Sequence, residues 1–337
     1  MMGSVSEGLH GGNLSWACET HGGLPSDWLD ISTGINPYSY AVPTFDPQLY
    51  QLLPQAHAEQ RLVRAARIAY ACPIEADVAL ANGTQALIQW LPQLRARCRV
   101  AIVGFTYSEH AAAWARAGHS MDAPSSIGDV ESDIDVVVLT NPNNPDGHRV
   151  TRDALLELHA KLHERGGWLV VDEAFADCDE SESMAAYSHL PGLIVLRSFG
   201  KFYGLAGVRL GVALCESELV VRLRAAMGPW TVSGPALAIG AAALEDRVWR
   251  ETMRDQLAAT SKSLVETLNS AGWDVLGSTG LFVLARHQQA QAYWNRMVQE
   301  RILVRRFVEQ PQWLRFGLAK EEGMQRLARF MARFMAP

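Results

Sequence analysis

The chain of 337 residues has no long hydrophobic run and no cluster of basic residues. The longest apolar run, residues 236–244, contains a glycine and is far shorter than the roughly 20 residues that cross a bilayer. Residues 1–9 carry neither a positive nor an apolar segment, so no secretory signal is predicted. The net charge is −6, which argues against a nucleic-acid partner. We therefore expect a cytoplasmic protein with neither a membrane nor a nucleic acid as partner.

Cysteine is scarce, odd in number and without a Cys-x-x-Cys pair. A zinc ribbon or a disulfide scaffold is therefore not expected, and the cysteines are expected to be reduced thiols. His159 and His163 have a metal-compatible spacing, but their charged neighbours indicate a solvated helix face and supply no third ligand. No metal site is predicted. The cysteines are Cys18, Cys72, Cys98, Cys178 and Cys215.

Hydrophobic residues make up 48% of the chain, enough for a sizeable core in about two domains. After residue 72, short valine-rich runs alternate with helical patterns, which is typical of an α/β fold with a mostly parallel sheet. Strands are predicted at 77–81, 99–103, 135–140, 168–171, 193–196 and 208–214. Helices are predicted at 48–71, 85–96, 108–117, 152–164 and 216–226.

Composition divides the chain into three predicted regions. Residues 1–43, rich in glycine, serine and proline, form an irregular N-terminal arm. Residues 44–233 form the large α/β domain. Residues 234–337 begin with a long helical pattern without cap signals, to residue 271, and continue as a small α+β domain. Its strands are predicted at 280–284, 302–306 and 313–318.

Lys201 lies in a glycine-rich, mostly apolar loop. A lysine forms a Schiff base well only when its amine is neutral, and both desolvation and a nearby cation lower its pKa. Ser198 and Arg209 supply a hydroxyl and a bidentate cation, the groups that anchor a phosphate. This combination predicts pyridoxal 5′-phosphate (PLP), bound covalently at one end and ionically at the other. The alternative is an ordinary glycine-rich loop.

Further polar residues follow predicted strands, where open α/β sheets bind their ligands. Gly83 and Thr84 open a helix after the first strand, a pattern that binds phosphate or forms a plain capped turn. Asp172 ends a buried strand and would pair with the pyridinium nitrogen of PLP. The alternatives are a helix cap and a magnesium ligand, the latter without a supporting P-loop lysine motif. Asn144 could donate to the phenolate oxygen and Tyr107 could stack on the ring. The alternative for Asn144 is a place in a rigid turn, and the alternative for Tyr107 is core packing.

The order of these motifs between residues 82 and 209 resembles that of the fold-type-I PLP enzymes of the aspartate aminotransferase superfamily. The resemblance implies a large domain with a mostly parallel sheet of the seven-stranded type, a small α+β C-terminal domain and a homodimer. It implies Lys201, Asp172 and Tyr107 as catalytic residues and Asn144 as the phenolate-oxygen donor. The residues that resemble the phosphate cup are Gly83, Thr84, Ser198 and Arg209.

Two branches of this superfamily share the Asn-Pro-Asn-Asn-Pro and Gly-Leu-Ala-Gly-x-Arg patterns: the threonine-phosphate decarboxylases of cobalamin synthesis and the histidinol-phosphate aminotransferases. Residues 9–13 and 30–37 are similar to the His-Gly-Gly arm and the Asp-x-Ser-x-x-Ile-Asn-Pro segment of the decarboxylases. Phe175 and Leu53 stand where many relatives have tyrosine, which weakens the aminotransferase interpretation. The decarboxylase branch is favoured, and the aminotransferase is the alternative.

This resemblance implies a small phosphorylated amino acid, L-threonine O-3-phosphate, as substrate. Arg315 matches an arginine that binds the substrate carboxylate, and Arg305 matches one that binds phosphate in histidinol-phosphate aminotransferases. Which of the two binds which group stays open. His10, Asn36 and Asn144 are expected to add substrate contacts, although His10 could be an ordinary arm residue. A PLP-fold regulator ranks lower, because no DNA-binding module fits in the chain and Lys201 is present.

Overall fold

The computed structural model describes residues 11–334, which divide into two compact units. Ser39–Arg254 forms the large unit, and the described residues up to Tyr38 join those from Asp255 onward in the small unit. These bounds differ from the predicted regions 1–43, 44–233 and 234–337. The N-terminal segment pairs with a C-terminal strand, and helix α9 (Gly234–Glu245) packs on α3 (Ala56–Ala69) of the large unit.

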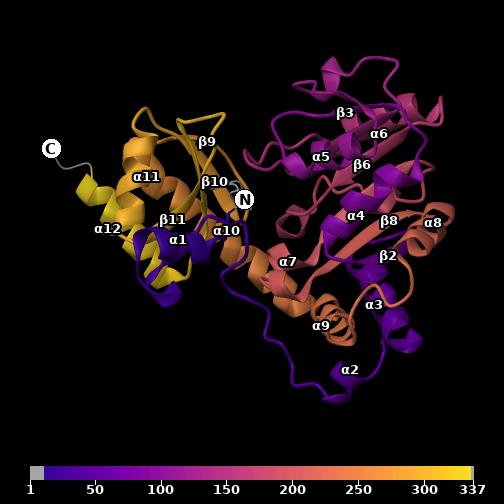
Figure 1. Ribbon diagram of the computed structural model, residues 1–337, viewed down its shortest axis with the longest axis horizontal. Helices are drawn as coiled ribbons and strands as arrows, with labels where there is room; N and C mark the ends of the chain where they lie inside the picture. The colour runs from indigo at the N-terminus through magenta and orange to yellow at the C-terminus, as the bar shows by residue number, and fades with distance from the viewer. Residues whose placement is uncertain (1–10, 335–337) are drawn as a thin grey trace, which may run out of the picture. The chain divides into compact units, whose positions relative to one another are not determined.

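A seven-stranded sheet of order β2-β8-β7-β6-β5-β3-β4 forms the centre of the large unit (Figure 1). β8 is antiparallel to both β2 and β7, and the remaining pairs are parallel. This confirms the predicted α/β fold with a mostly parallel sheet. The strands are β2 (Ala76–Asn82), β3 (Arg99–Ile102), β4 (Ser120–Asp122), β5 (Val136–Thr140), β6 (Trp168–Asp172), β7 (Leu193–Ser198) and β8 (Leu210–Glu216).

The central strands of this sheet are buried on both faces, which is why they are continuously apolar. Val136 and Val138 of β5 pack in one cluster with α4, α5 and α8. The alternate residues, Val137 and Leu139, are buried on the other face of the sheet. The helices are α2 (Gln48–Gln51), α4 (Thr84–Trp90), α5 (Ser108–Arg116), α6 (Arg152–His163), α7 (Phe199–Phe202) and α8 (Ser217–Met227), with α3 and α9 as given above. Short 3-10 turns occur at Pro25–Asp27, Leu91–Leu94, Ile127–Asp129, Ala176–Cys178, Ala185–Tyr187 and Ala206–Val208.

Two predicted helices are each broken in the structure. The predicted helix 48–71 is α2 and α3, because Pro54 lacks an N–H and disfavours helical geometry in the residue before it. The long pattern 234–271 is α9 and α10 (Arg247–Ser270), which are interrupted at Asp246. The expectation of a helix without caps was wrong, since Ser233 Oγ accepts a hydrogen bond from the Ala236 N–H at 3.4 Å.

His159 is also placed differently from the prediction of a solvated face. It is 5% exposed, its Nε2 lies 3.0 Å from the Pro191 carbonyl oxygen, and its ring stacks on that of His163. Burial lowers the pKa of His159. Within residues 11–334 there is no group of three or more histidine, cysteine, aspartate or glutamate side chains that could hold a metal ion.

The small unit contains a five-stranded sheet of order β1-β11-β12-β10-β9. The expectation of an irregular arm was wrong for its described part, because residues 14–21 form a helix and β1 pairs in parallel with β11. In Figure 1 the indigo α1 lies beside α11, near the other end of the chain. The elements are α1 (Leu14–His21), β1 (Leu29–Ile31), β9 (Asp274–Ser278), β10 (Phe282–Arg286), α11 (Ala290–Gln299), β11 (Ile302–Arg306), β12 (Trp313–Gly317) and α12 (Glu321–Phe334).

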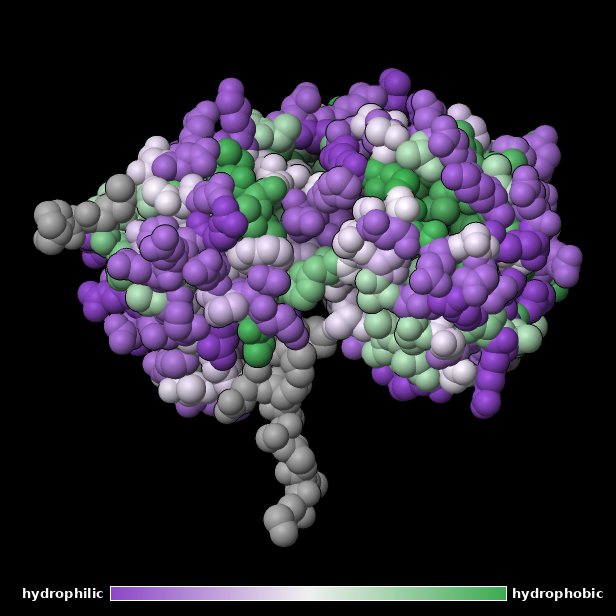
Figure 2. Space-filling view, turned by 90° about the horizontal axis from the view of Figure 1, so that it is seen from above, coloured by the Kyte–Doolittle hydropathy of each residue, from purple (hydrophilic) through white to green (hydrophobic). Residues whose placement is uncertain are grey.

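The surface of the described residues is predominantly polar on the face shown in Figure 2, where apolar residues appear in small groups. None of the helices within residues 11–334 has the length and the apolar character that crossing a membrane requires.

Candidate active site

A buried carboxylate lies at the carboxyl end of β6. Asp172 is 4% exposed, and its Oδ2 lies 2.8 Å from His110 Nε2 in the first turn of α5. Its Oδ1 accepts a hydrogen bond from the Ala174 N–H at 3.1 Å. Because an ionised carboxylate only accepts hydrogen bonds, this pairing requires a proton on His110 Nε2. Asp172, oriented by His110, therefore lies at the carboxyl end of β6, where a carboxylate fits the protonated nitrogen of a ring.

The loop after β5 is fixed against the backbone of Asp172. Thr140 pairs with Asp172 in the parallel register, and the Asn141 N–H donates to the Asp172 carbonyl oxygen at 2.9 Å. The Asn141 side chain bonds both the N–H and the carbonyl of Val150, each at 3.0 Å. Asn143 Nδ2 donates to the Asp146 carboxylate at 2.9 Å. Asn144, the next residue of this rigid loop, is thereby held at the same sheet edge.

Lys201 lies in α7, directly after β7. Its Nζ is 5.6 Å from the centre of the Phe175 ring, and Phe175 belongs to the loop that follows Asp172. The loop after β6 and the turn after β7 therefore meet at the lysine, as the parallel order of these strands requires. Phe175 has no hydroxyl group, so this position supplies no phenolic donor.

Gly83 and Arg209 form a cradle that a side chain at residue 83 would fill. Gly83 has φ 76° and ψ 155°, and a Cβ there would lie 2.5 Å from Arg209 Nη2. A Cβ at Gly211 would lie 2.3 Å from the Thr84 nitrogen. These close approaches need glycine, and they bring a guanidinium group to the backbone N–H groups at the start of α4. The cradle fits a phosphate, and Ser198 ends the neighbouring strand β7.

The predicted stacking residue, Tyr107, lies beside the buried pair. Its hydroxyl donates to Gln85 Oε1 at 3.2 Å, and its ring meets His110 edge-on with 6.2 Å between ring centres. Burial raises the pKa of Tyr107, and the charges of Glu109 and Asp172 raise it further. The phenol is therefore neutral, and its stacking on a cofactor ring stays a prediction.

Sequence reasoning missed His110 and a buried ion-pair cluster beneath the site. Arg197 is fully buried; its Nη1 lies 2.8 Å from Glu173 Oε2, and its Nη2 lies 2.9 Å from Asp177 Oδ1 and from Glu180 Oε1. Its guanidinium carbon lies 4.3 Å from the centre of the Tyr70 ring. Arg197 and Glu173 are the sequence neighbours of Ser198 and Asp172, so this cluster ties together the two segments that carry the predicted cofactor residues. Charged residues next to the ends of apolar strands were the only signal in the sequence.

The small unit brings its two predicted arginines together. Arg305 of β11 and Arg315 of β12 are direct cross-strand partners, so their side chains share one face of the sheet. Burial lowers the pKa of both, and the charge of Arg305 lowers that of Arg315 further. Asn36 is 2% exposed and its Oδ1 accepts from the Tyr38 N–H at 2.8 Å. His10 lies outside the described residues.

The residues of the large unit fit PLP. Asp172 suits a protonated ring nitrogen, Lys201 suits an aldehyde, and the cradle at Gly83 and Arg209 suits a phosphate. Two arginines on one face of the small unit suit a compound with two anionic groups.

Comparisons with known proteins agree with one another on the family of this chain. The family model described as "Aminotransferase class I and II" matches residues 53–331. The threonine-phosphate decarboxylase of Pseudomonas aeruginosa is 42% identical over 318 residues, which cover 93% of each chain. That of a Sinorhizobium species is 38% identical over 331 residues, covering 96% of this chain and 98% of the relative. The crystal structure of L-threonine-O-3-phosphate decarboxylase from Porphyromonas gingivalis shares the fold, with a TM-score of 0.76 at 20% identity over 91% of this chain and 99% of that one.

Proposed function

The chain belongs to the aminotransferase class I and II family, and from this premise we propose that it is a PLP-dependent decarboxylase of L-threonine O-3-phosphate. The observation that carries the proposal is the 42% identity to a threonine-phosphate decarboxylase over 93% of both chains. In the proposed reaction the bond between Cα and the carboxylate breaks, carbon dioxide leaves, and a proton takes its place on Cα. The product is (R)-1-amino-2-propanol O-2-phosphate.

PLP, when bound, supplies an electron sink for the pair left by the departing carbon dioxide. We assign Lys201 to bind the cofactor and, once released from it, to donate the proton to Cα. Asp172, oriented by His110, keeps the ring nitrogen protonated. Tyr107 and Asn144 position the ring. The residues assigned to the cofactor phosphate are Gly83, Thr84, Ser198 and Arg209.

We assign Arg305 and Arg315 to the two anionic groups of the substrate, with Asn36, Asn144 and His10 as additional contacts. The two guanidinium groups repel each other on one sheet face, and burial makes their charge costly. A bound anion relieves both effects, so the substrate gains binding energy from its phosphate and carboxylate. Firm binding of these two remote groups would orient the Cα–carboxylate bond for cleavage.

We also propose that the protein acts as a homodimer. Supporting this, the segment around α2 exposes large apolar side chains: Tyr50 is 74% exposed, Leu52 56% and Leu53 58%. Sedimentation analysis of the holoenzyme tests this proposal. A monomer at micromolar concentration would contradict it.

The decisive experiment incubates the purified protein with PLP and L-threonine O-3-phosphate. Carbon dioxide release that needs no 2-oxo acid acceptor is the expected result. Amino transfer that depends on an acceptor, and proceeds best with histidinol phosphate, would instead identify an aminotransferase. The Lys201→Ala variant serves as control and is expected to lose both turnover and the visible absorption band of the lysine-bound cofactor.

A further inference from the structure

Ser32, the residue directly after β1, connects two parts of the small unit that are far apart in sequence. It is 2% exposed. Its Oγ accepts a hydrogen bond from the Gly12 N–H at 2.7 Å, and its backbone carbonyl accepts from Arg315 Nη2 at 2.8 Å. One residue therefore contacts both the segment before α1 and the guanidinium group assigned to the substrate.

Asp30 orients the Ser32 hydroxyl. Asp30 Oδ1 accepts from Ser32 Oγ at 2.6 Å and from the Ser32 N–H at 2.9 Å. Because a carboxylate only accepts hydrogen bonds, the hydroxyl proton points to Asp30 and a lone pair of Oγ is left for the Gly12 N–H. Asp30 itself is fixed by β1, where it pairs with Leu303 of β11.

The backbone around Ser32 is packed too closely for side chains on its neighbours. A Cβ at Gly11 would lie 2.3 Å from the Ser32 carbonyl oxygen, and a Cβ at Gly317 would lie 2.1 Å from that of Thr33. Real Cβ atoms do not approach oxygen so closely, so glycine is required at both positions. The N-terminal segment and the end of β12 are thus held against the same loop.

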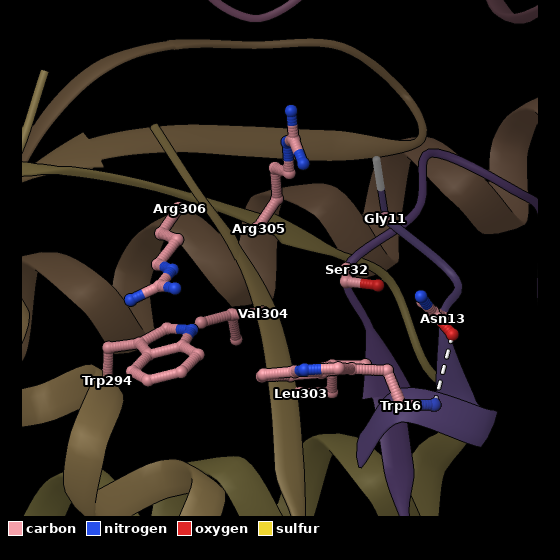
Figure 3. Close-up of a pocket in the computed structure, with 9 residues that line it drawn as sticks. All are labelled: Gly11, Asn13, Trp16, Ser32, Trp294, Leu303, Val304, Arg305 and Arg306. Atoms are coloured by element: carbon pink, nitrogen blue, oxygen red, sulfur yellow. Dashed lines mark hydrogen bonds between the residues drawn. The ribbon is translucent and has the colours of Figure 1, made fainter. Parts of the chain in front are cut away.

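The docked segment forms one wall of a hollow in the small unit. Gly11 and Ser32 line one side, and Trp294 and Arg306 line the opposite side (Figure 3). The guanidinium carbon of Arg306 lies 4.2 Å from the centre of the Trp294 ring. Arg305 lines the same hollow. The position of the N-terminal segment therefore sets the shape of a hollow that contains an anion-binding candidate.

We propose that Asp30 and Ser32 are positioning residues that set the affinity for the anionic substrate. They hold the segment at Gly11–Gly12 against the hollow and fix Arg315 through the Ser32 carbonyl. This inference rests on the proposed function, since it takes Arg305 and Arg315 as substrate ligands. It accounts for the Asp-x-Ser segment after residue 29, to which the proposed reaction assigns no chemistry.

The test compares Ser32→Ala and Asp30→Asn with a matched control, Ser126→Ala. Ser126 Oγ makes the same two kinds of bond, donating to Asp129 Oδ2 at 2.8 Å and accepting from the Gly128 N–H at 3.2 Å, but it lies in the large unit. For Ser32→Ala the KM for L-threonine O-3-phosphate is expected to rise about 3–10-fold, the equivalent of one lost hydrogen bond, with kcat within about twofold. Asp30→Asn is expected to have a smaller effect of the same kind. Ser126→Ala is expected to change neither constant.

Hydrogen exchange supplies a readout that does not depend on turnover. In Ser32→Ala, peptides covering residues 12–21 are expected to exchange faster than in the wild type, because the Gly12 N–H loses its acceptor. Unchanged exchange would refute the docking role, and faster exchange with an unchanged KM would refute the link to substrate affinity. A fall in kcat equal to the rise in KM, with loss of the cofactor band, would indicate general damage and also overturn the proposal. If the wild type neither binds nor converts L-threonine O-3-phosphate, the proposed function fails, and exchange alone decides whether Ser32 docks the segment.

Discussion

Replacing His110 with phenylalanine tests whether the buried histidine supports the chemistry of Asp172. Phenylalanine has a similar planar ring, so the packing of α5 against the sheet is largely kept. The variant removes the donor that lies 2.8 Å from Asp172 Oδ2, in a site where histidine and aspartate are 2% and 4% exposed. The carboxylate keeps its bond to the Ala174 N–H but loses a buried, charge-assisted one.

The expected loss follows from this geometry. A hydrogen bond to a charged group contributes about 1.5–3 kcal/mol. If the charge of Asp172 stabilises the protonated ring nitrogen, losing the free energy of this hydrogen bond raises the reaction barrier by the same amount. The turnover of His110→Phe is then expected to fall about 10–150-fold. His110→Gln retains an N–H donor and is expected to lose less than about tenfold.

The assay measures kcat for carbon dioxide release by the PLP-saturated enzyme, with the melting temperature recorded in parallel. His159→Phe is the matched control: it removes another buried histidine, with Nε2 3.0 Å from the Pro191 carbonyl oxygen, outside the site. The control is expected to lose stability but to keep its turnover. Turnover of His110→Phe within about twofold of the wild type would refute the reasoning, and so would an equal loss in both variants.

Three other expectations concern the cradle, the buried cluster and acidity. Gly83→Ala places a Cβ 2.5 Å from a guanidinium nitrogen and adds about 1–3 kcal/mol of backbone strain, so a titration should show weaker PLP binding; Gly166→Ala, at φ +68° with open space around it, should keep PLP affinity. Arg197→Met leaves buried carboxylates unpaired and should lower the unfolding free energy in urea by about 3–5 kcal/mol, whereas Arg61→Met, in an exposed pair, should lose at most about 1 kcal/mol. Burial lowers the pKa of His159 below its ordinary 6.5. The stabilising contribution of the neutral side chain is therefore complete above pH 6.5 and is lost as the pH falls towards the lower pKa of the folded state. In His159→Gln the difference in unfolding free energy between about pH 8 and about pH 5 should shrink, and an unchanged difference would contradict this.

Much of the large unit was predictable because its signals are local. The six predicted strands are present as β2, β3, β5, β6, β7 and β8, each with bounds shifted by at most two residues. A valine-rich run that is buried on both faces predicts a strand, whichever elements pack against it. β4 was missed because its three residues, Ser120–Asp122, carry no apolar run.

The N-terminal segment shows where local signals fail. Glycine, serine and proline indicated an irregular arm, yet residues 29–31 form a strand. That strand exists because it pairs with Ile302–Val304, about 270 positions away along the chain, and no local pattern reports such a partner. The same distance in sequence concealed the contact between Ser32 and Arg315.

The sequence by itself determined the α/β architecture, the order of the cofactor motifs and the identity of Lys201, Asp172 and Arg209 as the residues to examine, because these depend on short patterns at strand ends. The tertiary structure alone decided that His110 meets Asp172 and that Arg197 joins the two segments that carry the proposed cofactor residues. It also decided that Gly83 leaves room for Arg209. Each of these contacts joins residues that are distant in the chain, and they form only when burial removes water and leaves the charged and polar groups to pair with one another.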